Sequence, residues 1–251
     1  MLDRSKITVA LLSAGLGTRL RPITDTIPKV MVSFDGTPLL EHTILLLRDQ
    51  GFRKFVVNLH YLPQAIIDHF GNGERFGVEI IYTDEREELL ETGGGLKKME
   101  SHLSDTFIVV YGDHLHFYNF RALLDFHERH NALATLVLKR SDLPANGDIA
   151  EIDPETNRIT VWHPRPHDIE EYGNKYYLNS GLEVFSKRIL DFIPPKGPVK
   201  LDAQILPLLI KKRTDIYGLP TEENILDIGT PEKYEFAKNW YREQKNKNPG
   251  T

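Results

Sequence analysis

The sequence predicts an α/β domain built on a mixed, mostly parallel sheet with helices on its faces. Over residues 7–130, short apolar runs alternate with longer amphipathic segments, which is the pattern of parallel strands joined by covering helices. After residue 132, strand-like runs follow one another directly. This favours a smaller antiparallel lobe at about 132–185, packed on the parallel sheet. We expect one domain over residues 1–245 and a flexible tail at 246–251.

The individual elements follow from the spacing of apolar residues. Runs without helical spacing predict strands, and runs with apolar residues three or four positions apart predict helices. The expected strands span residues 7–12, 55–59, 78–82, 107–111, 134–139, 149–152, 158–162, 176–185 and 215–219. The expected helices span residues 38–50, 63–70, 96–103, 119–130, 186–192, 202–211 and 231–244. A long loop over 13–28 and a glycine-rich turn before residue 96 connect these elements.

Composition excludes several classes of function. The 31 basic and 36 acidic residues give a formal net charge of −5, which is not the broad positive surface of a nucleic-acid-binding protein. The chain has no cysteine, which rules out a disulfide framework, a thiolate nucleophile and a cysteine-based zinc site, and which fits a reducing cytoplasm. No apolar run approaches the roughly 18 residues that span a bilayer. We therefore expect a cytoplasmic protein that binds neither nucleic acid nor a membrane.

A loop rich in small and basic residues follows the first expected strand. Gly15 and Gly17 let the backbone approach a ligand closely and turn its N–H groups toward phosphate oxygens. Arg19, Arg21 and Lys29 add positive charge within the same segment. The loop matches neither the dinucleotide-binding fingerprint nor the P-loop. It predicts a site for a phosphorylated ligand, and a tight turn with surface cations is the alternative.

Four segments resemble the motifs of one enzyme family. Residues 15–24, followed by Pro-Lys at 28–29, resemble the signature loop of the sugar-1-phosphate nucleotidyltransferases. Three later segments are similar, in the same order, to that family's base-binding turn, strand-ending Gly-Asp and closing Asp-Ile-Gly-Thr-Pro motif: residues 90–95, 111–113 and 226–234. The likeness runs from about residue 7 to residue 234.

Two aspartates in these motifs are candidate metal ligands. Asp113 directly follows an expected strand and should emerge at the carboxyl edge of the sheet. Asp227 precedes the turn into the last expected helix. Two carboxylates from distant segments suit a Mg²⁺ ion that also takes substrate phosphate oxygens. Turn formation and helix capping are the alternative roles of these two side chains.

Other motif residues have both a functional and a structural interpretation. The glycines at 93–95 predict close approach to a flat base, or a plain entry into a helix. Asn179 resembles the family's sugar-binding asparagine, and the alternative is a bulge beside Gly181. His114 and His116 would share one face of a strand, but no third ligand follows at a spacing typical of a transition-metal site.

The resemblance implies a Rossmann-like fold with a sugar-binding antiparallel lobe. It also implies a reaction in which an NTP and a sugar 1-phosphate give an NDP-sugar and pyrophosphate. Residues 68–77, taken with 90–95, are most similar to mannose-1-phosphate guanylyltransferases and N-acetylmuramate-1-phosphate uridylyltransferases. The first expectation is GTP with mannose or heptose 1-phosphate, and the second is UTP with an amino sugar 1-phosphate. A non-catalytic nucleotide-sugar-binding relative and a glycosyltransferase are further alternatives, and a homodimer is left open.

The resemblance also assigns roles to individual residues. Arg19 is expected to hold the β- and γ-phosphates, Lys29 to bridge the α-phosphate and the sugar phosphate, and Asp113 and Asp227 to hold Mg²⁺. The residues expected to face the nucleotide are Leu12, Ala14, Gly15, Gly17, Thr18, Arg19, Glu88, Thr92 and Gly93. Those expected to bind the sugar substrate are Gly112, Asn179 and Arg165. Arg165 stands in for a lysine, because residues 162–166 lack the Glu-Lys-Pro of many family members.

Overall fold

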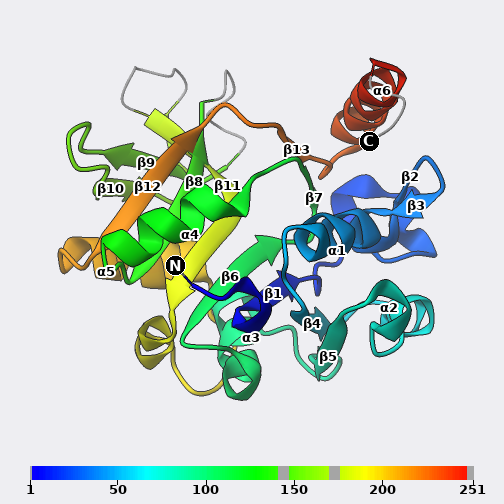
Figure 1. Ribbon diagram of the computed structural model, residues 1–251, viewed down its shortest axis with the longest axis horizontal. Helices are drawn as coiled ribbons and strands as arrows, with labels where there is room; N and C mark the ends of the chain where they lie inside the picture. The colour runs from blue at the N-terminus through cyan, green and yellow to red at the C-terminus, as the bar shows by residue number, and fades with distance from the viewer. Residues whose placement is uncertain (1, 141–146, 170–175, 248–251) are drawn as a thin grey trace.

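The computed structural model describes residues 2–140, 147–169 and 176–247, which form a nine-stranded sheet with helices on both faces (Figure 1). The strands are β1 Thr8–Leu12, β4 Lys54–Leu59, β5 Glu79–Asp84, β6 Thr106–Tyr111, β8 Ala134–Lys139, β9 Ile149–Ile152, β10 Ile159–His163, β11 Tyr176–Ser186 and β12 Ile216–Thr221. Their order across the sheet is β10-β9-β11-β6-β1-β4-β5, and β8 pairs with both β11 and β12. The predicted mixed α/β sheet is confirmed.

The centre of the parallel half is β1. It pairs in parallel with β4 on one side and with β6 on the other, and β4 pairs in parallel with β5. Val9 and Leu11 enter one hydrophobic core while Ala10 enters the other, so β1 is buried on both faces. Because the carboxyl ends of these strands lie at the same edge of the sheet, the loops that follow them gather there.

The antiparallel part of the sheet is organised by β11. Its residues 182–186 pair with β6, its residues 176–178 pair with β9, and β8 pairs along its other side. The sequence predicts that this part packs on the parallel sheet, and that is wrong: it extends the same sheet edge to edge. The extension satisfies the backbone N–H and C=O groups of β6 that would otherwise form an open edge.

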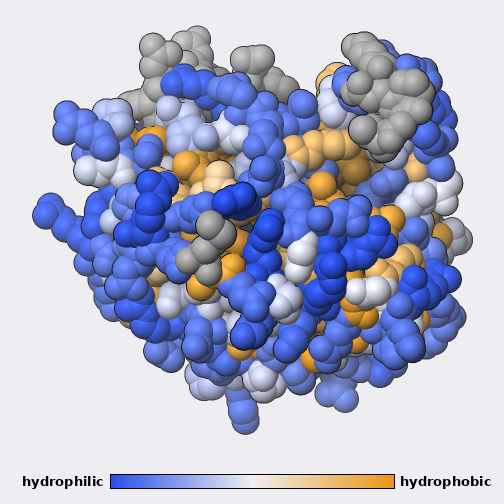
Figure 2. All heavy atoms as spheres, viewed as in Figure 1, coloured by the Kyte–Doolittle hydropathy of each residue, from blue (hydrophilic) through white to orange (hydrophobic). Residues whose placement is uncertain are grey.

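Helices cover the two faces of the sheet in two groups. The described α-helices are α1 Leu39–Asp49, α2 Pro63–Phe70, α3 Glu91–Met99, α4 Phe120–Arg129, α5 Leu206–Lys211 and α6 Pro231–Lys247. Apolar residues of α1, α2 and α4 pack into one core, and those of α3 and α5 into the other. Hydrophilic residues cover most of the face seen in Figure 2, and hydrophobic residues show only between them. None of the helices in the described segments is both long and apolar enough to cross a membrane.

Two short ladders stand outside the main sheet. β2 Ser33–Phe34 pairs with β3 Thr37–Pro38, and β7 His114–His116 pairs with β13 Ile225–Asp227. In the second ladder His114 lies opposite Asp227, and Ile228 N donates a hydrogen bond to the Asp113 carbonyl over 3.1 Å. This ladder therefore holds the two aspartate-bearing segments side by side.

The structure corrects the expected start of α3. The helix begins at Glu91, so the glycines at 93–95 lie inside it instead of in a turn before it. Glycine weakens a helix, but these three residues are buried and packed, and packing overrides propensity. The two expected helices that follow β11 also differ in type, since Lys187–Phe192 is a 3₁₀ helix and Leu201–Ile205 is a π-helical turn leading into α5.

The last helix runs further than the sequence predicts. α6 includes residues 246–247, which are expected in the tail, and residues 248–251 lie outside the described part of the chain. Tyr241 packs its ring edge-on against Phe34 and His42, and Lys245 forms an ion pair with Asp35. These contacts hold the second half of α6 on the β2–β3 segment and on α1.

Candidate functional site

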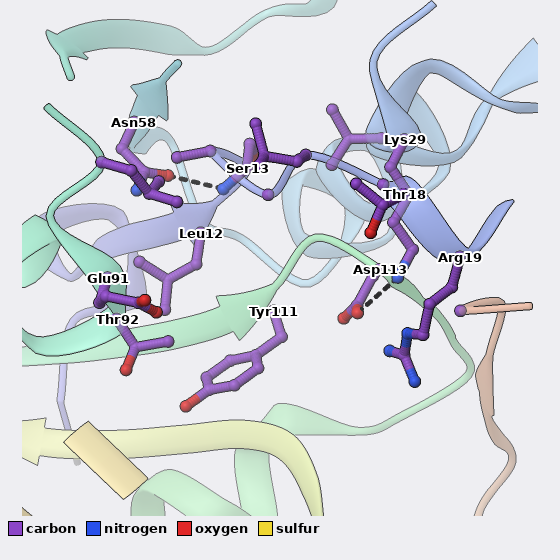
Figure 3. A pocket seen from close by; sticks show the side chains of 17 residues that line it. Leu12, Ser13, Thr18, Arg19, Lys29, Asn58, Glu91, Thr92, Tyr111 and Asp113 are labelled. Atoms are coloured by element: carbon purple, nitrogen blue, oxygen red, sulfur yellow. Dashed lines mark hydrogen bonds and ion pairs between the residues drawn. The ribbon is translucent and has the colours of Figure 1, made fainter. Parts of the chain in front are cut away.

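A cavity of about 350 Å³ opens where the carboxyl ends of β1, β4 and β6 meet. It is lined by Leu12, Ser13, Ala14, Gly15, Leu16, Gly17, Thr18, Arg19, Lys29, Val30, Asn58, Leu89, Glu91, Thr92, Tyr111, Asp113 and Gly229. Figure 3 shows Arg19, Lys29 and Asp113 at one end and Asn58, Glu91 and Thr92 at the other, with the Tyr111 ring between them. We call it the first cavity. The lining cations therefore lie at one end of the cavity, which we call its positive end, and uncharged polar side chains and Glu91 lie at the other.

The glycine-rich loop forms one wall of the first cavity. An ideal Cβ built on Gly15 would meet no described atom within 4 Å, so this backbone borders open space. Gly17 has a φ of 64° and starts a 3₁₀ turn, Thr18–Leu20, that presents Arg19 to the cavity. The Thr24 hydroxyl donates to the Gly17 carbonyl over 2.8 Å and fixes the turn. The loop therefore positions backbone and guanidinium donors in front of an open volume.

An ion pair occupies the positive end of the first cavity. Lys29 Nζ lies 2.7 Å from Asp113 Oδ2, and the lysine side chain is only 10% exposed. His114 Nδ1 lies 2.8 Å from Asp113 Oδ1, away from the direction of a good hydrogen bond, so this contact is mainly electrostatic. Burial would raise the pKa of Asp113, but His114 and Lys29 hold it well below its usual value. Asp113 is therefore an ionised carboxylate beside the Lys29 ammonium group.

Asp227 reaches the same end from the β13 side. Gly229 N donates to its Oδ1 over 2.6 Å, and Lys233 Nζ lies 2.5 Å from its Oδ2. A Cβ on Gly229 would sit 2.8 Å from Asp227 Oδ1 and 3.2 Å from an Arg19 guanidinium nitrogen, so these groups converge. Burial opposes ionisation of Asp227, but His114 and Lys233 outweigh it and lower its pKa.

A buried polar chain closes the other end of the first cavity. Asn58 Oδ1 accepts a hydrogen bond from Ser13 N over 2.6 Å, and its Nδ2 donates to Glu85 Oε1 over 2.8 Å. Glu85 Oε2 accepts from Leu90 N over 3.0 Å, and burial raises the pKa of this carboxyl. The chain ties the glycine-rich loop to the start of α3. Sequence reasoning missed it, although a polar Asn58 inside a buried strand was the available signal.

The glycines of α3 face other parts of the protein. Gly93 N donates to the Val199 carbonyl over 2.7 Å, and a Cβ on Gly94 would lie 2.7 Å from the Gly197 carbonyl. A Cβ on Gly95 would lie 2.8 Å from Glu85 Oε1. The close approaches that the structure shows at these glycines are therefore to neighbouring backbone and side chain of the protein.

A second cavity of about 690 Å³ adjoins the first and shares Glu91, Thr92 and Tyr111 with it. Its lining consists of Glu91, Thr92, Tyr111, Asp148, Arg165, Pro166, His167, Lys200, Asp202 and Ala203. The Tyr111 hydroxyl donates toward both oxygens of Asp202, over 2.9 and 3.0 Å. Burial and then the nearby Asp148 carboxylate raise the pKa of Asp202 to about 7.

Asn179 and Glu183 lie on β11 close to the second cavity without lining it. Asn179 Nδ2 donates to Glu183 Oε1 over 3.0 Å, and the β8–β11 register shifts between these two residues. Gly181, at a φ of 71°, lies inside this irregularity, which matches the bulge alternative for Asn179. Glu183 Oε2 has no hydrogen-bond partner among the described residues, and burial, followed by the charge of Asp202, raises the pKa of Glu183.

The structure gathers most, but not all, of the predicted site residues. The first cavity contains Leu12, Ala14, Gly15, Gly17, Thr18, Arg19, Lys29, Thr92 and Asp113, and the second contains Arg165. Neither of these two cavities is lined by Glu88, Gly93, Gly112, Asn179 or Asp227.

The positions of Gly93 and Asn179 are explained above. The structure also shows why Glu88, Gly112 and Asp227 do not line either cavity. Glu88 is exposed, and Glu85 is the buried acid of that loop. Gly112 N donates to the Leu12 carbonyl over 2.9 Å, and a Cβ there would clash with Val30, so Gly112 packs two strand ends together. Asp227 lies behind Gly229, which lines the cavity itself.

Sequence comparison identifies the family. The model described as nucleotidyl transferase matches residues 8–244. The chain belongs to the nucleotidyl transferase family. It is 30% identical to UTP–glucose-1-phosphate uridylyltransferase of Synechocystis over 237 residues, which are 89% of this chain and 60% of that protein. It is 32% identical to mannose-1-phosphate guanyltransferase of Kluyveromyces lactis over 229 residues, 89% of this chain and 62% of that protein. This nucleotidyl transferase thus spans about 60% of the length of these relatives.

Structural comparison supports the same family. The crystal structure of HddC from Yersinia pseudotuberculosis superposes with a TM-score of 0.78 at 26% identity, covering 94% of this chain and 99% of that one. The same protein has been solved in complex with GMP-PN, and that structure superposes with a TM-score of 0.77 at 25% identity, over 94% of this chain and 99% of that one. The expected resemblance to sugar-1-phosphate nucleotidyltransferases is confirmed.

Proposed function

We propose that this nucleotidyl transferase transfers NMP from an NTP to a sugar 1-phosphate, giving an NDP-sugar and pyrophosphate. The observation that carries the proposal is the pair of adjoining cavities, which share Tyr111, Thr92 and Glu91 and therefore allow two substrates to meet. The attacking phosphate oxygen is already ionised, so the reaction needs no side-chain nucleophile. It needs positioning and neutralisation of charge.

The first cavity has the features of a nucleotide site. Its glycine-rich loop leaves open space at Gly15 for the phosphates, and Arg19 supplies forked donors for the β- and γ-phosphates and for departing pyrophosphate. Lys29 supplies a second cation where the α-phosphate and the incoming phosphate would meet. The end near Asn58 is left for the base and ribose.

Asp113 and Asp227 fit a Mg²⁺ ion. Both offer hard carboxylate oxygens, both have lowered pKa values, and the β7–β13 ladder holds their segments together. Bound there, Mg²⁺ would neutralise charge on the reacting phosphates.

The second cavity has the features of a sugar-phosphate site. Arg165 offers a donor for phosphate, and its backbone N–H is fixed by a 2.8 Å hydrogen bond to Asp148 Oδ1. Asp202, with its pKa near 7, can donate as well as accept a hydrogen bond at neutral pH, which suits a sugar hydroxyl. Asn179 would act behind this surface, through Glu183.

The proposed substrates are GTP and mannose or heptose 1-phosphate. The guanyltransferase relatives and the HddC structure with a guanine nucleotide analogue support this pair. UTP with a sugar 1-phosphate is the second candidate, because the Synechocystis relative is named as a UTP-dependent enzyme. A non-catalytic binding role is less well supported, since Arg19, Lys29, Asp113 and Asp227 are all present and converge. The lack of cysteine supports the cytoplasm as the proposed location.

A matrix of four NTPs against a panel of sugar 1-phosphates, scored by pyrophosphate release, tests the proposal. We expect pyrophosphate only when both substrates are present, and most with GTP and mannose or heptose 1-phosphate. Release of a nucleoside diphosphate would indicate a glycosyltransferase instead, and nucleotide binding without turnover would indicate a regulatory relative.

A further inference from the structure

Nitrogen atoms of the protein already contact the carboxylate oxygens of Asp113 and Asp227. The oxygens of Asp113 lie 2.7 Å from Lys29 Nζ and 2.8 Å from His114 Nδ1. Those of Asp227 lie 2.6 Å from Gly229 N and 2.5 Å from Lys233 Nζ. A divalent cation that binds both carboxylates therefore has to compete with the lysine ammonium groups for the negative charge of these oxygens.

Lys233 is the contact that local structure explains least. It lies in the first turn of α6, where the helix dipole disfavours a positive side chain. Its backbone N–H already donates a hydrogen bond to the Thr230 hydroxyl oxygen over 3.4 Å, so the side chain is not needed to start the helix. A residue that opposes its local preference usually serves a tertiary or functional contact, and here that contact is Asp227.

The other nitrogen contacts are less able to give way. Lys29 is 10% exposed and enclosed in the cavity wall, whereas the Lys233 side chain is 28% exposed and can turn into solvent. Gly229 N belongs to the backbone of the turn. Besides these groups, Asp113, His114 and Arg19 face Asp227. Lys233 is thus the cation that can leave Asp227 at the smallest structural cost.

We propose that Lys233 is a built-in counter-cation that competes with the divalent metal ion for Asp227. In the absence of metal its ammonium neutralises the carboxylate, and metal binding releases the side chain to solvent. Lys233 thereby lowers the affinity of the free enzyme for metal. The proposal rests on the proposed function only in taking Asp227 as a metal ligand.

Mn²⁺ binding to the full chain, without nucleotide or sugar phosphate, tests this competition. Free Mn²⁺ is followed by electron paramagnetic resonance in chelator-treated protein. Lys233→Met should tighten Mn²⁺ binding by about five- to tenfold, because a partly exposed ion pair is worth about 1 kcal/mol. Lys233→Arg retains the charge and should bind Mn²⁺ as weakly as the wild type.

Lys238 supplies a matched control on the same helix. Its side chain is 27% exposed and is paired with Glu235, away from the aspartates, so Lys238→Met should leave Mn²⁺ affinity unchanged. An unchanged or weaker affinity for Mn²⁺ in Lys233→Met would overturn the competition.

Asp227→Asn separates the assignment of Asp227 as a metal ligand from the competition by Lys233. If it weakens Mn²⁺ binding while Lys233→Met has no effect, the metal site stands and the competition fails. If Asp227→Asn leaves binding unchanged, the metal assignment fails and the competition fails with it.

Discussion

Partly buried carboxyl groups lie at both of the adjoining cavities, but their surroundings drive ionisation in opposite directions. At the positive end of the first cavity, His114 and Lys29 lower the pKa of Asp113. His114 and Lys233 lower the pKa of Asp227, which lies behind Gly229 of the cavity wall. In the second, burial and neighbouring acids dominate, and the pKa of Asp202 rises to about 7.

The difference shows how one residue type can serve two chemistries a short distance apart. Ionised carboxylates beside cations are suited to a metal ion and phosphate groups. Carboxyl groups that hold a proton near neutral pH can both donate to and accept from sugar hydroxyls. Environments that push the pKa values of like groups apart are a recurring sign of divided roles within one site.

The largest expected effect tests the ionised pair. Asp113→Asn and Asp227→Asn should each reduce turnover by at least about a hundredfold, because each removes a ligand of the same metal ion. The double variant should lose little more than either single variant, since one metal site can be lost only once. Turnover of both singles and the double at saturating Mg²⁺ checks this. Losses that multiply would mean that the two aspartates act separately, and the first cavity would then lack a shared metal site.

The next effect tests whether the positive end of the first cavity is functional. Arg19 is exposed and lines the cavity, so Arg19→Ala should lower turnover by roughly a hundredfold, about 3 kcal/mol, with an unchanged melting temperature. Arg21→Ala is the matched control in the same loop, because Arg21 pairs with Asp25 at 3.2 Å and does not line the cavity. Equal turnover in the two variants would mean that Arg19 is a surface cation without a role in turnover.

The smallest effect concerns the protonated carboxyl of the second cavity. A carboxyl whose pKa rises from 3.8 to about 7 on folding stabilises the fold at low pH, and this contribution is lost as the pH rises toward 7 and above. Asp202→Asn removes the titration. The stability of the wild type should therefore fall relative to the variant by roughly 2–3 kcal/mol between pH 5 and pH 8.

Chemical denaturation at several pH values measures this difference. Asp191→Asn, a change at an exposed position, should show no such pH-dependent difference from the wild type. Parallel pH curves for the wild type and Asp202→Asn would show that Asp202 is ionised throughout, and the contrast between the cavities would disappear.

Sequence reasoning succeeded where a residue's neighbours in the chain determine its position. Arg19, Lys29 and Asp113 follow buried strands that end at one edge of the sheet, so the strand pattern alone places them together. The two glycine-rich segments show the limit of this reasoning. Gly15 borders open space while Gly94 lies against the Gly197 carbonyl. The sequence nevertheless predicts a close approach to a ligand at both positions. A glycine indicates that something comes near without indicating what.

The remaining site residues depend on contacts between distant segments. Asn58 and Glu85 are 27 residues apart, and Tyr111 and Asp202 are 91 apart, so no local motif reports their pairing. The same holds for the edge-to-edge joining of β11 to β6, because apolar alternation specifies a strand but not the partner that it selects. These features follow from how the elements pack, which a single sequence does not display.

The position of an isotope label tests the proposed reaction most directly. GTP labelled at the α-phosphate and GTP labelled at the γ-phosphate are incubated separately with mannose 1-phosphate, Mg²⁺ and the protein. We expect the α-label to enter the nucleotide sugar and the γ-label to appear only in pyrophosphate. Transfer of the γ-label to the sugar phosphate or to inorganic phosphate, or an α-label that stops in a nucleoside diphosphate, would contradict nucleotidyl transfer.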